Sequence, residues 1–133
     1  MEDLDRLIVR LLTKDGRMSY TDLGKATGLS TSAVHQRVRR LEQRGVIKGY
    51  AAIVDPARLG LSVQAFVQVR LERHTDDNVE QFHRALESLS EVVGCFATTG
   101  AHDFMLQVVA ADLESFGTLV LKKLLKVPGV RDV

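Results

Sequence analysis

The sequence predicts an α+β protein with two parts: an N-terminal three-helix helix-turn-helix domain, winged-helix-like, and a C-terminal ferredoxin-like αβ sandwich joined to it by a short β hinge. Apolar residues recur at helical spacing up to about residue 44, and strands and helices alternate after residue 63. Charge is divided in the same way. Residues 1–48 hold ten Lys/Arg and six Asp/Glu, whereas residues 49–133 hold eight and eleven. Such an asymmetry predicts two functions in one chain.

The first two helices are predicted from apolar spacing and capping residues. One apolar face over residues 3–14 comprises Leu4, Leu7, Ile8, Leu11 and Leu12. This i, i+3, i+4 pattern is typical of an amphipathic helix, and Asp15-Gly16-Arg17 ends it. Ser19 followed by Asp22 resembles a capping box, which opens a second, shorter helix.

Residues 29–45, LSTSAVHQRVRRLEQRG, predict a third helix with two different faces. Ser30 can cap its first turn, and Gly45 can adopt the left-handed conformation that closes its end. Val34, Val38 and Leu41 form one apolar stripe. The opposite face carries Ser32, Gln36, Arg39, Arg40 and Gln43, with His35 at its border.

That polar face predicts a DNA-recognition helix, because amides and guanidiniums read base edges in a major groove. A charged face alone is common on solvated helices, but the short Thr27-Gly28 turn before it completes a helix-turn-helix unit. We expect Ser32, His35 and Gln36 near bases. Arg39 and Arg40 would reach guanines or phosphates, and Arg44 and Lys48 phosphates. The full candidate set is Ser30, Thr31, Ser32, His35, Gln36, Arg39, Arg40, Arg44 and Lys48. Arg37 lies nearer the core flank, where it could instead pair locally.

After Gly45 the period of the pattern changes. The expected elements are a strand at 47–54 ended by Asp55-Pro56, a strand at 64–73, a helix from Asp76, strands at 92–99 and 103–110 joined by a turn at 100–102, and a helix from Asp112 to about Lys126. A ferredoxin-like unit needs one more strand, and Val130–Val133 is shorter than an ordinary strand of about 5–6 residues. We therefore expect the sandwich to lack its last strand and the native chain to continue beyond Val133.

Several classes of protein are disfavoured by composition. No apolar run approaches the ~18 residues of a membrane span, and the acidic start lacks the features of a signal peptide. The single cysteine, Cys95, excludes an internal disulfide and lies in an apolar run typical of a buried thiol. The four histidines show no metal-ligand spacing, and no nucleophile–base pair stands out. We expect no enzyme, no metal and no cofactor, and a cytoplasmic, nucleoid-associated, prokaryotic protein.

Four stretches of the chain are distinctive together: LDRLIVRLLTKDGRMSYTDLGKATGLS, SAVHQRVRRLEQRGVIKGYAAIVDPARLG, TTGAHDFML and VPGV. On these stretches the chain resembles the Lrp/AsnC (feast/famine) family of transcriptional regulators. The resemblance implies a DNA-binding domain at residues 1–48, a hinge strand and linker at 49–62, and an effector-binding and oligomerisation domain at 63–133. It also implies a homodimer that assembles into tetramers, octamers or larger forms, and a small effector, commonly an amino acid. Two recognition helices acting together would read an imperfect palindrome in double-stranded DNA.

The same resemblance places the effector at the glycine-containing turn. The residues implied are Thr98, Thr99, Gly100, Ala101, His102, Asp103 and Phe104. Backbone N–H groups near glycine can receive a carboxylate, and Asp103 can take an ammonium group. A simple hairpin turn is the alternative, since Gly and Asp also occur there for backbone reasons. For the whole chain, the alternative is an architectural DNA-compacting protein with weak sequence preference.

Overall fold

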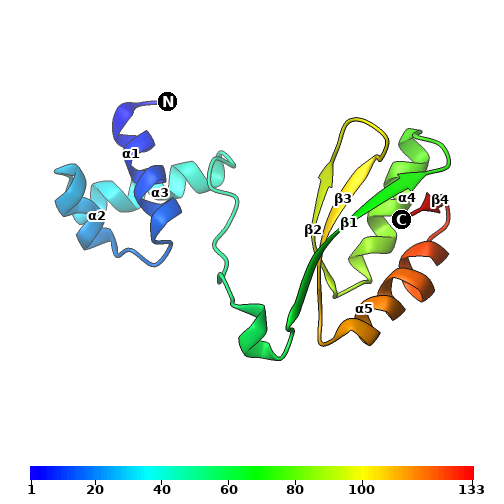
Figure 1. Ribbon diagram of the computed structural model, residues 1–133. Coiled ribbons are helices and arrows are strands. Elements are labelled where there is room, and N and C mark those ends of the chain that lie inside the picture. The colour runs from blue at the N-terminus through cyan, green and yellow to red at the C-terminus, as the bar shows by residue number, and fades with distance from the viewer. The chain divides into compact units, whose positions relative to one another are not determined.

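The computed structural model describes all 133 residues, which divide into two units, Met1–Ile53 and Val54–Val133 (Figure 1). Each unit encloses a separate cluster of buried apolar side chains. The two units are therefore described one at a time.

Three helices form the first unit where the sequence predicted them: α1 (Asp3–Lys14), α2 (Tyr20–Thr27) and α3 (Thr31–Gln43). Their core consists of Ile8, Leu23, Val34, Val38 and Leu41, none more than 1% exposed. Both predicted caps are confirmed. Ser19 Oγ accepts a hydrogen bond from the Asp22 amide at 3.0 Å, and Ser30 Oγ accepts one from the Ala33 amide at 3.2 Å. Gly45, with φ of 72°, closes α3 in the left-handed region.

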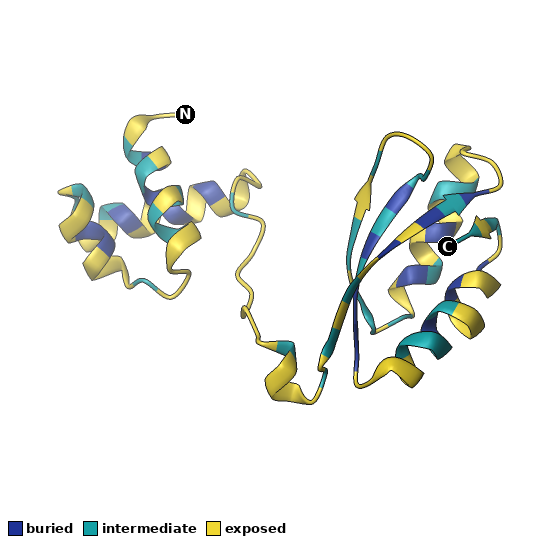
Figure 2. Ribbon diagram, in the orientation of Figure 1, coloured by how far each residue is buried: buried dark blue, intermediate teal, exposed yellow.

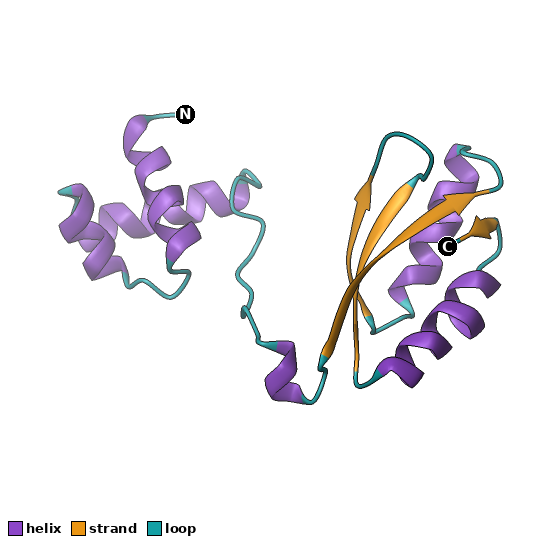
Figure 3. Cartoon of the chain, viewed as in Figure 1, coloured by secondary structure: helices purple, strands orange, loops and turns teal.

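The strand predicted over residues 47–54 is wrong. Residues 48–55 are neither helix nor strand, and a single 3-10 turn, η1 (Pro56–Leu59), follows them (Figure 3). A strand needs a hydrogen-bonded neighbour, and residues 48–54 make no backbone hydrogen bond within this chain. Their β-type sequence therefore leaves an extended segment without a partner.

The second unit is a four-stranded antiparallel sheet with two helices. Its strands are β1 (Val63–Leu71), β2 (Val92–Ala97), β3 (Phe104–Ala110) and β4 (Val130–Asp132), in the order β2-β3-β1-β4. The helices are α4 (Asp76–Glu87) and α5 (Leu113–Thr118), and α5 continues through a wide π-type turn, Leu119–Lys123, and a 3-10 turn, Leu124–Lys126. The order of helices and strands along the chain, and the order of strands in the sheet, confirm the predicted ferredoxin-like arrangement.

The expectation that the last strand is missing is wrong. β4 pairs antiparallel with the end of β1 through Arg70 and Leu71, and the Glu72 amide donates a hydrogen bond to the Gly129 carbonyl at 2.8 Å. An edge strand needs only one neighbour, so three residues suffice here, although they fall short of ordinary strand length.

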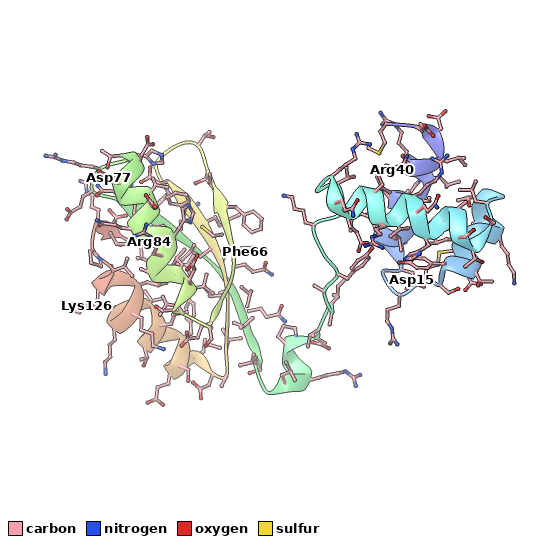
Figure 4. The ribbon with its side chains drawn as sticks, turned by 180° about the vertical axis from the view of Figure 1, so that it is seen from behind. Asp15, Arg40, Phe66, Asp77, Arg84 and Lys126 are labelled. Carbon is pink, nitrogen blue, oxygen red and sulfur yellow. The ribbon has the colours of Figure 1, made fainter.

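Both helices cover the same face of the sheet, and the other face is bare (Figures 1 and 2). On the covered face, Val67, Val69 and Leu71 of β1 are nearly inaccessible to solvent and pack against side chains of α4 and of the turns after α5. Phe66 of β1 points to the opposite side of the sheet and is 64% exposed (Figure 4), and Phe96 of β2 is 51% exposed. Buried and exposed side chains therefore alternate along β1, and the uncovered face presents Phe66 between the exposed Gln64 and Gln68.

Candidate nucleic-acid interface and effector turn

The surface of α3 is divided as the sequence predicted. Val34, Val38 and Leu41 are buried against α1 and α2. The remaining positions named as DNA contacts are all exposed: Ser30, Thr31, Ser32, His35, Gln36, Arg39, Arg40, Arg44 and Lys48. Buried and exposed bands alternate along α3 in Figure 2. The structure thus brings these side chains together on and beside one solvent-facing surface.

Two small polar residues define the start of that surface. The Ser30 hydroxyl caps α3 and lies 3.3 Å from the Ser32 hydroxyl. No acidic residue lies in the first turn of α3. Uncompensated N–H groups and the positive end of the helix dipole therefore remain available to a phosphate.

Arg37 does not belong to the DNA-facing set, and the local-pairing alternative is correct. Its Nη1 donates to Glu2 Oε2 at 2.9 Å and to Asp5 Oδ1 at 3.1 Å. Asp5 is 5% exposed, so this ion pair ties α3 to a buried carboxylate of α1. Hydrogen bonds donated first to Glu2 and then to Asp5 raise the pKa of the Arg37 guanidinium, which therefore stays charged and bound to its acidic partners.

Two residues that shape the helix-turn-helix were missed by sequence reasoning. A Cβ on Gly24 of α2 would lie 2.6 Å from the Leu29 carbonyl oxygen, so the close approach of the turn to α2 needs glycine. Tyr20 of α2 places its ring centroid 5.1 Å from that of His35. Neither contact has a sequence signal, because each joins residues outside the spacing of a single helix.

The turn predicted to bind the effector is a closed hairpin loop in this structure. The Thr98 amide donates to the Asp103 carbonyl at 2.9 Å, and Thr98 Oγ1 donates to the His102 carbonyl at 3.0 Å. Gly100, with φ of 100°, adopts a backbone conformation that other residues rarely reach. Thr99, Gly100 and Ala101 are exposed at its tip.

Asp103 is held by β1 and by the loop after it. Its Oδ2 accepts a hydrogen bond from the Leu71 amide at 2.7 Å, and its Oδ1 lies 3.1 Å from His74 Nδ1. Phe104 is 3% exposed and packs on Phe82 with ring centroids 5.1 Å apart. The aromatic ring at the end of the predicted effector set is therefore a core residue and forms no open wall of a binding site.

A polar cluster beside the turn was not foreseen, because it depends on β4. Asp132 Oδ1 lies 3.8 Å from Arg70 Nε and 4.0 Å from His102 Nε2. The Arg70 Nε atom is buried and has no hydrogen-bond partner. An open hollow of about 590 Å³ adjoins His102, with Phe66, Met105 and Phe116 among its lining residues.

Chemistry of other kinds has little support in the structure. No group of three or more His, Cys, Asp or Glu side chains is placed to hold a metal ion. Burial raises the pKa of the half-buried Cys95 thiol, which disfavours the reactive thiolate. None of the helices combines the length and apolar character needed to cross a bilayer.

Comparison with known proteins gives matches to both units. The AsnC-type helix-turn-helix domain matches residues 1–42, and the Lrp/AsnC ligand binding domain matches residues 64–133. The leucine-responsive regulatory proteins of Escherichia coli K12 and Salmonella typhimurium are each 39% identical to the chain over 132 residues, which covers 99% of this chain and 80% of each relative.

Solved structures agree. A transcriptional regulator of Neisseria meningitidis in complex with L-Met matches with a TM-score of 0.90 and 34% identity, covering 99% of this chain and 85% of that one. An AsnC family transcriptional regulator of Agrobacterium tumefaciens matches with a TM-score of 0.87 and 31% identity, over 99% and 86% of the two chains.

Proposed function

Because the chain belongs to the Lrp/AsnC family of DNA-binding transcriptional regulators, we propose that it reads an imperfect palindrome through the exposed face of α3 and answers to an amino acid bound near the turn at residues 98–103. The proposal that α3 reads DNA rests on the separation of buried and exposed side chains on this helix. Its apolar stripe is fully buried, its amides and two of its arginines face solvent, and Arg37 is withdrawn into an ion pair.

Within that face the roles divide along the helix. Ser32, His35 and Gln36 lie in the N-terminal half of α3, the part of a recognition helix that enters the major groove, so they choose the sequence. Arg39 and Arg40 reach guanines or phosphates. Arg44 and Lys48, at the exit of the helix, contact phosphates, and Ser30 and Thr31 do so at its start. Most of the basic residues therefore fix the orientation of the protein on the duplex through phosphates and do not read bases.

A palindromic site requires two copies of α3, and two features support a homodimer. The bare sheet face exposes Phe66 and Phe96 together with Gln64 and Gln68, and large apolar side chains exposed on one face with a polar surround are typical of a surface that pairs with another chain. The extended segment 48–54 includes Ile53, which is fully exposed, and its backbone groups are free for a second strand. Dimers would then assemble into tetramers, octamers or larger forms on the nucleoid, in the cytoplasm.

The test of DNA reading is fluorescence anisotropy on duplexes selected from a random library by the full chain. Gln36→Ala should cost about 1–3 kcal/mol and relax preference at one base pair. Arg44→Ala should weaken binding to selected and scrambled duplexes alike and flatten the salt dependence by about one phosphate contact. Gln81→Ala on α4 and Arg58→Ala after the linker, both exposed, are the matched controls.

Failure to select any sequence would support the architectural alternative. In that case the ratio of specific to non-specific affinity at fixed salt would be near one, whereas a sequence-specific regulator gives at least about 10³. Equal affinities of wild type, Gln36→Ala and Arg44→Ala for the selected duplex would defeat the assignment of α3.

For the effector, the support is the geometry of the turn and two relatives. The structure from Neisseria meningitidis is a complex with L-Met, and the Escherichia coli relative is named leucine-responsive. In this chain, backbone N–H groups at Thr99, Gly100 and Ala101 would receive the carboxylate. The carboxylate of Asp103 would take the ammonium group, in competition with His74, while His102 borders the adjoining hollow and Phe104 supports the turn from the core.

Calorimetric titration of the full chain with each of the twenty amino acids tests this proposal. Binding of one or a few, abolished by Gly100→Val, is the expected result. The absence of heat from all twenty, together with an unchanged assembly size in light scattering, would contradict it.

A further inference from the structure

The only aromatic contact between two helices of the first unit lies at its surface. Tyr20 is the first residue of α2, and His35 lies in the second turn of α3. Their ring centroids are 5.1 Å apart and the ring planes are inclined by 35°. Tyr20 is 37% exposed, His35 is exposed, and neither belongs to the core of the unit. Burial of apolar area therefore gives little reason for the contact.

The position of His35 gives a better reason. It lies about 100° round α3 from the buried Val34, on the border between the core flank and the reading face. An unsupported imidazole at a border can rotate toward either side. The Tyr20 ring occupies the flank toward α2, and His35 makes no hydrogen bond that would fix it otherwise. The Tyr20 ring meets the imidazole at a tilt of 35° and makes no hydrogen bond with it, so both ring nitrogens remain available to donate to or accept from a base.

The location of Tyr20 fits the same purpose. Ser19 caps α2 directly before it, so the first turn of α2 is well ordered. In a helix-turn-helix the first helix of the motif crosses the DNA backbone while the second lies in the groove. Tyr20 therefore stands where the two helices meet the duplex, beside a residue proposed to read bases.

We propose that Tyr20 is a specificity-determining positioning residue that acts through His35, holding its imidazole in one orientation toward the major groove. This inference rests on the proposed function of α3. Ordering a side chain before binding removes an entropic cost that an unsupported side chain would pay on reaching the base. Loss of the Tyr20 ring should then weaken specific binding about threefold to tenfold and leave non-specific binding nearly unchanged.

The experiment measures anisotropy of the full chain on a duplex selected from a random library by the wild type, on every single-base variant of it, and on a scrambled duplex of the same composition. The variants are Tyr20→Ala, Tyr20→Phe, His35→Ala and the double variant. Tyr20→Ala should relax preference only at the base pair that His35→Ala also relaxes. The double variant should be no worse than His35→Ala alone, and Tyr20→Phe should match the wild type.

A merely structural role for Tyr20 would give a different pattern. Tyr20→Ala would then weaken selected and scrambled duplexes equally, or its loss would add to that of His35→Ala, and either result overturns the inference. Arg58→Ala, at an exposed side chain after the linker, is the control. Should Tyr20→Ala unfold, Tyr20→Leu keeps apolar bulk without an aromatic ring and carries the same prediction.

Failure of the proposed function would be seen separately. If Gln36→Ala and His35→Ala both leave every base preference intact, α3 is not the reading helix. If those two variants relax the preference and Tyr20→Ala does not, only the role of Tyr20 is refuted.

Discussion

Replacing Asp103 by alanine should destabilise the second unit, because this carboxylate joins the β2–β3 turn to the end of β1. It accepts a hydrogen bond of 2.7 Å from the Leu71 amide, and Leu71 is 4% exposed. In Asp103→Ala the amide loses its partner in a place that water scarcely reaches. A hydrogen bond to a charged group contributes about 1.5–3 kcal/mol, and a buried donor left unpaired costs about as much as the bond.

The contact with His74 adds little to that figure. The Asp103 side chain is 23% exposed and that of His74 is 61% exposed, so solvent screens the pair. We therefore expect Asp103→Ala to lower the free energy of unfolding of the second unit by about 2–3 kcal/mol. His74→Ala should cost no more than about 0.5 kcal/mol. Asp103→Asn keeps an acceptor oxygen for the Leu71 amide and should cost about half as much as alanine.

Urea unfolding followed by circular dichroism, with hydrogen–deuterium exchange of the Leu71 amide, measures these effects. The amide should lose protection selectively in Asp103→Ala and keep it in His74→Ala. Equal stabilities and equal protection in all three variants would refute the structural role of Asp103. The carboxylate would then be free for a ligand alone, as the sequence suggested.

Four further predictions concern other parts of the chain. Arg37→Met should lower the melting temperature of the first unit by leaving the buried Asp5 carboxylate unpaired, while Glu2→Gln, at a side chain 69% exposed, should not; equal melting temperatures would contradict the pairing. Gly24→Val should cost about 1–3 kcal/mol in thermal unfolding, since its Cβ would meet the Leu29 carbonyl; an unchanged melting curve would show that the turn yields. The hydrogen bond from Lys123 lowers the pKa of Glu91 below its ordinary value of 4.5. The ion pair therefore stabilises the fold above that pH, and this stability is lost as the pH falls through the lower pKa of the folded state. Glu91→Gln should make the free energy of unfolding less dependent on pH in the acid range, and an unchanged dependence would contradict the pairing. Cys95 should react with a disulfide reagent at least about tenfold more slowly in the native than in the urea-unfolded chain, because burial raises the pKa of its thiol; similar rates would show an open thiol.

The first unit was predictable because its signals are local. Ser19 and Ser30 cap helices as expected, and the 3.6-residue period of Val34, Val38 and Leu41 identifies the buried stripe. The exposed candidates for DNA contact follow from the same period. Their exposure agrees with the hypothesis, and their roles stay a prediction.

Non-local features were out of reach of the sequence. The pairing of β4 with Arg70 and Leu71 depends on where β1 ends, which three residues near Val130 do not encode. In the same way, the strand expected at 47–54 has β-type residues but no neighbour within the chain.

The last helix shows a subtler limit. Leu113 and Leu125 are 75% and 38% exposed, whereas Leu119 and Leu124 are both buried. Residues five apart lie about 140° apart on an α-helix. The wide turn at Leu119–Lys123 brings Leu119 and Leu124 onto one face. No capping residue or apolar period in the sequence predicts such a turn.

The strand order also has a consequence for the time course of folding. Every core contact of the first unit joins helices close together in sequence, so this unit can fold within microseconds to milliseconds while synthesis continues. The second unit cannot fold so early in synthesis, because its first strand pairs with residues made much later. Val63 pairs with Ala110, and Leu71 pairs with Val130. On the ribosome, β1 therefore emerges long before either neighbour exists, with Phe66 and its covered-face valines exposed together. We expect the nascent chain to be most prone to aggregation, and most dependent on chaperones, in the interval between release of β1 and release of β3.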